Sequence, residues 1–236
     1  PEIALGHGDR QVCRRIEETG IPFRRLRPKE MFEPQHIVGG SKIAIFDFSH
    51  RATRSQLEEA AHIFTNLNQR GVSSLLIDGK GQECLSALSP MMVDTLVIPY
   101  SGAEKQKVFP GAKVDVRGPR YMILDDSFLK KRVTTYTPPP IAEKILVTAG
   151  GSDPKNLTLF FLKVLGKVTV PIRIRAVVGP SFSPNLIEAI SSMAQVLPHP
   201  ITLVQAPETL ANEICEADLA LSASGLTKYE LAFRFE

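Results

Sequence analysis

Hydrophobic residues in the first half of this chain form short runs that alternate with a longer segment of helical periodicity. The runs at 42–47, 74–78 and 95–98 are rich in Ile, Leu, Val and Phe and end at polar or turn residues, which is typical of buried strands. Residues 56–70 lie between the first two runs and place five apolar side chains on one helical face: Leu57, Ala60, Ala61, Phe64 and Leu67. Strands and helices that alternate in this way predict a parallel sheet of the α/β class.

The second half repeats this alternation more regularly. Strands are predicted at 145–149, 172–178, 201–204 and 218–222, and helices at 156–163, 185–195, 208–216 and 224–231. Between the two halves, residues 134–140 are the best linker in the chain, because three consecutive prolines stiffen it and forbid a helix. We therefore expect an N-terminal domain over 1–137 and a C-terminal domain over 138–236.

The turn after the strand at 145–149 carries the first candidate chemistry. Gly150 and Gly151 are followed by Ser152, Asp153 and Pro154, so we expect Ser152 or Asp153 to cap the next helix and Pro154 to begin it. Without side chains on the two glycines, a phosphate or diphosphate could reach free amides at the positive end of that helix. The pattern is neither GxGxxG nor a Walker A loop, and an ordinary strand-to-helix turn is the alternative.

A second turn of this kind leads into the last helix. It contains Ser224, Gly225 and Thr227 and follows the strand at 218–222. In an open α/β sheet, ligands bind beyond the carboxyl ends of the strands, so the two turns are expected to converge on one ligand. Glu230 lies near the first turn of the last helix, where it either accepts hydrogen bonds from a ribose diol or caps its own helix.

Composition and charge narrow the class of ligand. The net charge of +3 fits an anionic small molecule, and no Lys/Arg run with interleaved aromatic residues predicts nucleic-acid binding. Three widely spaced cysteines, Cys13, Cys84 and Cys215, form no CxxC pair, so we expect a reduced intracellular protein without a metal site. No apolar stretch reaches the ~20 residues of a membrane span. A soluble, cytoplasmic protein is expected.

Near the N-terminus, a candidate base lies between two glycines. His7 is either a general base for an attacking water or a loop histidine that makes backbone hydrogen bonds. Arg10 either orients a phosphate or pairs with Asp9, and Asp78, at the end of an apolar run, either holds substrate hydroxyls or caps the next turn. Such a glycine turn normally follows a strand, and the pattern predicts none before it.

Three motifs, in order along the chain, together resemble those of a known family. Its GHxxR turn is matched by Gly6, His7 and Arg10, and its GGSDP loop by residues 150–154. Its segment ADLAISAGGxTxYEL is similar to residues 217–231, and its GPRY motif matches 118–121. On these motifs, the chain resembles the UDP-sugar hydrolases of pseudaminic acid biosynthesis and the related spore-coat polysaccharide biosynthesis proteins.

The resemblance implies a glycosyltransferase-B architecture, in which two Rossmann-like domains face each other across a cleft. It implies cleavage of a UDP-linked diacetamido-trideoxy sugar by water, with inversion and without metal or other cofactor. Gly150, Gly151, Ser152, Asp153, Ser224, Gly225 and Thr227 would hold the phosphates and Glu230 the ribose, while Gly6, Arg10, Asp78 and Tyr121 would bind the sugar beside His7. A glycosyltransferase and a non-catalytic nucleotide-sugar binding domain are the alternatives, and fusion to or association with other sugar-biosynthesis enzymes is expected.

This sequence also departs from the family pattern. Between Arg10 and Val12 the family has most of a helix and a strand, and relatives continue beyond residue 236, so we expect an incomplete architecture with a truncated second domain. Gly79 stands where relatives often have a second Asp, and Ser224 replaces a glycine. These changes put the substrate, and activity itself, in question.

Overall fold

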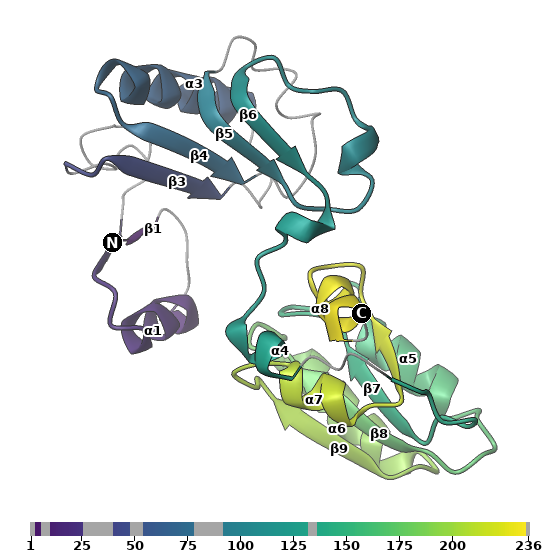
Figure 1. Ribbon diagram of the computed structural model, residues 1–236. Coiled ribbons are helices and arrows are strands. Elements are labelled where there is room, and N and C mark those ends of the chain that lie inside the picture. The colour runs from purple at the N-terminus through teal and green to yellow at the C-terminus, as the bar shows by residue number, and fades with distance from the viewer. Residues whose placement is uncertain are drawn as a thin grey trace. The chain divides into compact units, whose positions relative to one another are not determined.

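The computed structural model describes residues 3–5, 10–25, 40–47, 54–77, 92–131 and 136–234 (Figure 1). The chain divides into two compact units, Pro1–Ile123 and Leu124–Glu236. Within the described residues, each unit contains a four-stranded, wholly parallel sheet. The predicted α/β class with two Rossmann-like domains is therefore confirmed.

The large sheet of the first unit keeps its strands in chain order. They are β3 (Ile43–Asp47), β4 (Ser73–Ile77), β5 (Val93–Ile98) and β6 (Ala112–Arg117). Helix α3 (Arg54–Gln69) connects β3 to β4 and covers one face with Ile63, Phe64 and Leu67, which are at most 2% exposed. These side chains pack against Leu76, Leu96 and Ile98 in one hydrophobic core.

A smaller sheet pairs β1 (Ile3–Leu5) with β2 (Phe23–Arg25) in parallel, joined through α1 (Arg10–Glu18). The prediction that no strand precedes the glycine turn at 6–8 is therefore wrong. Three residues are too few for a periodic pattern to reveal a strand, and the pairing of Ile3 with Phe23 is what defines it. Helix α1 runs without a break through residues 11 and 12.

Strand β6 was not predicted because its charges alternate with its apolar residues. The structure pairs those charges: Lys113 Nζ lies 2.5 Å from an Asp94 carboxylate oxygen, and Arg117 Nη2 lies 2.5 Å from Asp115. Burial works against ionisation of Asp115, but hydrogen bonds from Arg117 and from the Phe109 amide outweigh it and hold its pKa below the ordinary value. An edge strand can thus carry charged side chains where each has a partner of opposite charge within the sheet.

The second unit has the strand order β10-β7-β8-β9. Its strands are β7 (Lys144–Thr148), β8 (Arg173–Val178), β9 (Ile201–Gln205) and β10 (Leu219–Ser222). Its longer helices are α5 (Leu157–Leu165), α6 (Pro184–Val196) and α8 (Thr227–Arg234), and its shorter ones α4 (Asp126–Lys130) and α7 (Ala211–Glu216). These strands and the helices α5 to α8 fall within two or three residues of their predicted positions, whereas α4 was not predicted.

Both faces of this second sheet are covered. Ile145 and Val147 on β7 pack with Leu162 on α5 and Ile190 on α6, whereas Leu146 packs with α4 and α7 on the opposite face. Burial on both faces explains why β7 is a continuous apolar run rather than an alternating one.

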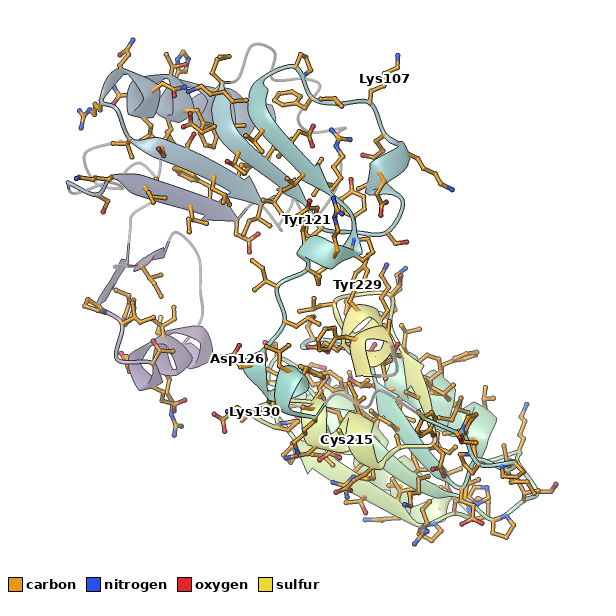
Figure 2. All side chains as sticks on the ribbon, in the orientation of Figure 1. Lys107, Tyr121, Asp126, Lys130, Cys215 and Tyr229 are labelled. Atoms are coloured by element: carbon orange, nitrogen blue, oxygen red, sulfur yellow. The ribbon has the colours of Figure 1, made fainter. Side chains whose placement is uncertain are left out.

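Helix α4 belongs to the second unit although it precedes the proline-rich segment. Its side chain Phe128 is buried, and Ser127 Oγ lies 2.8 Å from Thr209 Oγ1. Lys131, directly after the helix, hydrogen-bonds to Asn212 on α7. Figure 2 labels Asp126 and Lys130 on α4 and Cys215 on α7. The division between the units lies ahead of α4, and the domain boundary expected at 137–138 stays a prediction. None of the described helices is long and apolar enough to cross a membrane.

Candidate functional site

The chain reverses direction within the second sheet between β7 and β10. From β7 it proceeds outward through β8 to β9 and then returns to place β10 on the other side of β7. Ser222 at the end of β10 pairs with Thr148 at the end of β7, and the Ala223 amide donates to the Thr148 carbonyl at 3.2 Å. The two predicted glycine turns therefore leave adjacent strand ends, at the switch point where open α/β sheets bind ligands.

Asp153 closes the first turn and caps the following helix. It is 2% exposed, and its two carboxylate oxygens accept from the amides of Leu157 at 2.7 Å and Thr158 at 2.9 Å. The expectation that Ser152 or Asp153 is the N-cap residue and Pro154 the first helical residue is wrong, because the N-cap is Asn156 and α5 begins at Leu157. Asp153 nevertheless serves the helix amides from outside the N-cap position. The side chain of Asp153, a residue with φ 40°, thus reaches forward over Pro154, Lys155 and Asn156 to the helix.

This cap occupies the helix amides that an anion was expected to use. Two amides of the α5 N-terminus already serve the Asp153 carboxylate, which is buried and not available to a ligand. Gly150, Gly151 and Ser152 are exposed, and among the described residues no hydrogen bond uses the amides of Gly151 or Ser152. An anion at this turn would therefore meet the turn amides.

The backbone conformation requires glycine at one position of the two turns, and neither conformation nor packing requires it at two others. Gly150 has φ 81°, in the left-handed region that favours glycine. Gly151 and Gly225 have ordinary φ, and a Cβ built on either would find no atom within 4 Å. Each of the adjacent turns thus has a glycine that nothing in the described protein explains, and close approach of a ligand to the backbone is a use for both.

The second turn presents the N-terminus of α8. The Leu226 carbonyl accepts from Tyr229 at 2.8 Å and from Glu230 at 3.3 Å, so the amides of Thr227 and Lys228 precede the first bonds of the helix. Ser224 and Gly225 are exposed, and Thr227 is buried. In contrast to α5, no hydrogen bond among the described residues occupies these amides.

Glu230 lies in the first turn of α8, next to Tyr229, which Figure 2 labels. Burial raises the pKa of its carboxyl group, the charge of Asp125 raises it further, and a hydrogen bond with Thr227 partly opposes both. Both roles expected for Glu230, a bond to a ribose diol and capping of its own helix, stay predictions.

The residues expected on the sugar side are described only in part. Tyr121 ends a 3-10 turn (Pro119–Tyr121), where Arg120 donates to its hydroxyl at 2.8 Å and lies 4.7 Å from the centre of its ring. Arg10 begins α1, but its side chain lies outside the described residues, as do Gly6, His7 and Asp78. Their predicted roles therefore stay predictions. Among the described residues, no group of three His, Cys, Asp or Glu side chains could hold a metal ion.

Sequence reasoning predicts a turn at Gly179 and Pro180 after β8 but gives it no role in the site. Gly179 is buried against the Gly150–Gly151 turn, and the Ser181 amide donates to the Gly151 carbonyl at 2.8 Å. A glycine directly after an apolar strand is the sequence signal that could have indicated this role. Its contact with the Gly150–Gly151 turn becomes visible only because β7 and β8 are adjacent in the folded sheet.

Comparison with known proteins supports the fold and gives little on chemistry. No protein-family model matches the chain. An uncharacterized protein of Methanocaldococcus jannaschii, MJ1062, is 29% identical over 123 residues, which are 49% of this chain and 24% of that protein. The chain thus spans about a quarter of this curated relative.

The structure is similar to the crystal structure of MurG from Acinetobacter baumannii, a protein with the glycosyltransferase-B fold. The TM-score is 0.54 at 16% identity, and the similarity covers 95% of this chain and 63% of MurG. At this identity the likeness shows the fold alone. The glycosyltransferase-B-like two-domain architecture is thereby confirmed.

Proposed function

We propose that this protein binds a nucleoside-diphosphate sugar in its second unit and transfers the sugar to an acceptor, as a glycosyltransferase. The observation that carries the proposal is the pair of exposed glycine turns at the β7–β10 switch point, each with a glycine that the fold does not require. Fold-level analogy with MurG favours a glycosyltransferase over other users of the same ligand.

The turns suit the diphosphate part of such a ligand. Free backbone amides at the first turn and at the positive end of α8 would stabilise negative charge, which builds up on the diphosphate as the bond to the anomeric carbon breaks. Each turn also carries one lysine, Lys155 in the first and Lys228 directly after the second. The acceptor oxygen would form the new bond and give its proton to a base, for which His7 is the candidate.

Hydrolysis is the second candidate, with water as the acceptor. It is favoured by a specific observation, the ordered match of the motifs at residues 6–10, 150–154 and 217–231 to UDP-sugar hydrolases. Both reactions break the same bond and release the same nucleotide. They differ in whether a second substrate is needed.

The test is to incubate the protein with a panel of UDP-activated sugars, with and without hydroxyl-bearing acceptors, and to measure released UDP. Acceptor-dependent release supports the glycosyltransferase, and release in water alone supports the hydrolase. UDP binding without release in any mixture would favour a non-catalytic nucleotide-sugar binding domain instead.

The location of the nucleotide is tested separately with Gly151→Trp, whose large side chain would cover the first turn. No described residue lies within 4 Å of a Cβ built on Gly151, so the protein can accommodate the indole there. Calorimetric titration should show a loss of UDP binding in this variant, because the indole would occupy the place of the ligand. The placement would be wrong if the variant bound UDP as tightly as the wild-type protein.

A further inference from the structure

Gly179, directly after β8, lies so close to the first turn that no residue with a side chain would fit in its place. A Cβ built on it would lie 2.4 Å from the Gly150 carbonyl oxygen and 2.5 Å from that of Gly151. Real Cβ atoms do not approach backbone oxygens this closely, and the neighbours here are backbone atoms that cannot rotate away. Because its φ is ordinary, Gly179 is needed for this contact and not for its own conformation.

The contact determines which way two peptide groups point. Both carbonyl oxygens are directed toward Gly179, and the Ser181 amide holds that of Gly151 at 2.8 Å. In a trans peptide the N–H group points opposite to the carbonyl. The amides of Gly151 and Ser152 therefore point away from β8, and no hydrogen bond among the described residues uses either of them.

We propose that Gly179 is a positioning residue for the nucleotide: by receiving the Gly150 and Gly151 carbonyls, it directs the Gly151 and Ser152 amides at the diphosphate. The inference rests on the function proposed above and adds to it a residue that does not itself touch the ligand. The carboxylate of Asp153 occupies the α5 amides, which leaves the turn amides as the free donors. Anion binding by two amides with a common direction is a recognised backbone device.

A purely structural role for Gly179 makes a different forecast. In that case a side chain at this position would lower stability, and the affinity for UDP would follow only as far as the protein unfolds. The chain offers a control in Gly166, at the end of α5 in the same unit. A Cβ there would lie 2.4 Å from Leu197 Cδ2, which is the movable end of a side chain and not backbone, and Gly166 lies at the other end of α5 from the turn.

The experiment compares Gly179→Ala, Gly166→Ala and the wild-type full chain by thermal unfolding and by UDP titration well below the unfolding temperature. Gly179→Ala should melt earlier, and Gly166→Ala should change the melting temperature less, because Leu197 can move aside. Only Gly179→Ala should bind UDP more weakly, by about tenfold or more, because two hydrogen bonds to a charged group are misdirected. Equal UDP affinity in Gly179→Ala and the wild type would overturn the inference, as would an equal loss in both variants.

A second measurement needs no variant and holds if Gly179→Ala does not fold. In the ¹⁵N-labelled wild-type protein, UDP should shift the amide resonances of Gly151 and Ser152 far more than those of Leu157 and Thr158, which Asp153 already binds. The reverse pattern would overturn the inference while leaving the proposed nucleotide site in place. A wild-type chain that does not bind UDP at all would overturn the proposed function, and the role of Gly179 with it.

Discussion

At the scale of residues, the glycines of the second unit have distinct physical reasons to be glycine. Gly150 needs a left-handed φ, Gly179 leaves no room for a Cβ, and Gly151 and Gly225 have neither constraint. Glycine costs conformational entropy on folding, so a glycine that the fold does not require is retained at some expense in stability. A ligand that approaches the backbone is a sufficient reason for that expense.

We therefore predict opposite effects for two substitutions one residue apart. Gly150→Ala should destabilise the second unit by about 1 kcal/mol or more, because alanine is strained at φ 81°. Gly151→Ala should leave the free energy of unfolding unchanged within about 0.5 kcal/mol, yet weaken UDP binding. Chemical denaturation and UDP titration of both variants test this, and a large loss of stability in Gly151→Ala would contradict it.

Glu230 is the described carboxyl group whose pKa is raised. The proton is bound more tightly in the folded than in the unfolded chain, so its contribution to stability is most favourable in acid and is lost as the pH rises from the ordinary glutamate pKa through the raised one. At neutral pH the ionised, part-buried carboxylate of Glu230 therefore lowers the free energy of unfolding.

It follows that Glu230→Gln should increase the free energy of unfolding at pH 7, and that this gain should disappear at pH values below the ordinary glutamate pKa. Denaturant unfolding of both proteins across that pH range gives the difference directly. A difference that is independent of pH, or that grows in acid, would show that the burial of the charge is not the cause. Weaker UDP binding by the variant would in addition support the ribose contact.

At the scale of elements, α5 depends on a cap that lies outside the helix. The carboxylate of Asp153 serves the amides of Leu157 and Thr158 from a buried position. In α6, Ser183 fills the conventional place and accepts from the Leu186 amide at 3.3 Å. The buried cap joins the helix to the turn before it, so α5 and the candidate site are stabilised by the same contact.

Asp153→Ala should lower the free energy of unfolding by about 2 kcal/mol or more, because it leaves two amides without a partner in a buried place. Ser183→Ala, on an exposed cap with one longer bond, should cost about 0.5–1 kcal/mol. The two variants are compared by denaturant unfolding and by UDP titration. Only Asp153→Ala should also weaken UDP binding, and an equal effect of both on affinity would argue against a supported turn.

At the scale of the whole molecule, stability is divided between separate cores. The residues around Leu76 and Leu96 form the core of the first unit, and those around Val147 and Leu146 form two clusters on the faces of the second sheet. Among the residues that the structure describes, none is shared between these clusters. Each unit therefore has the means to hold its own fold.

Leu96→Ala should accordingly destabilise the first unit by about 2–5 kcal/mol, since Leu96 is fully buried in its core. UDP affinity at low temperature should be unchanged, because the proposed nucleotide site lies in the second unit. The matched change Leu162→Ala, which is equally buried on α5, should affect stability and UDP binding together. Calorimetric unfolding with and without UDP separates the two outcomes.

Local patterns predicted most elements of the second unit because each of its strands contains a run of consecutive apolar residues and each longer helix is amphipathic. Two failures have physical causes. Strand β6 was missed because Lys113, Asp115 and Arg117 interrupt its apolar residues, and only their partners in the folded sheet make those charges acceptable. Helix α4 was missed because it has one buried side chain, Phe128, and is too short to show a period.

The sequence by itself determined the α/β class, the strand before Gly150 and the glycine turns, because each depends on residues that are neighbours along the chain. Tertiary structure decided that the turns belong together, since the return of β10 to the side of β7 is a matter of strand order that no local pattern contains. It also decided which amides are free: Asp153 takes those of α5, and Gly179, from another strand, turns those of Gly151 and Ser152 outward. Contacts between residues distant in sequence carry that information, because only folding brings them within hydrogen-bond range.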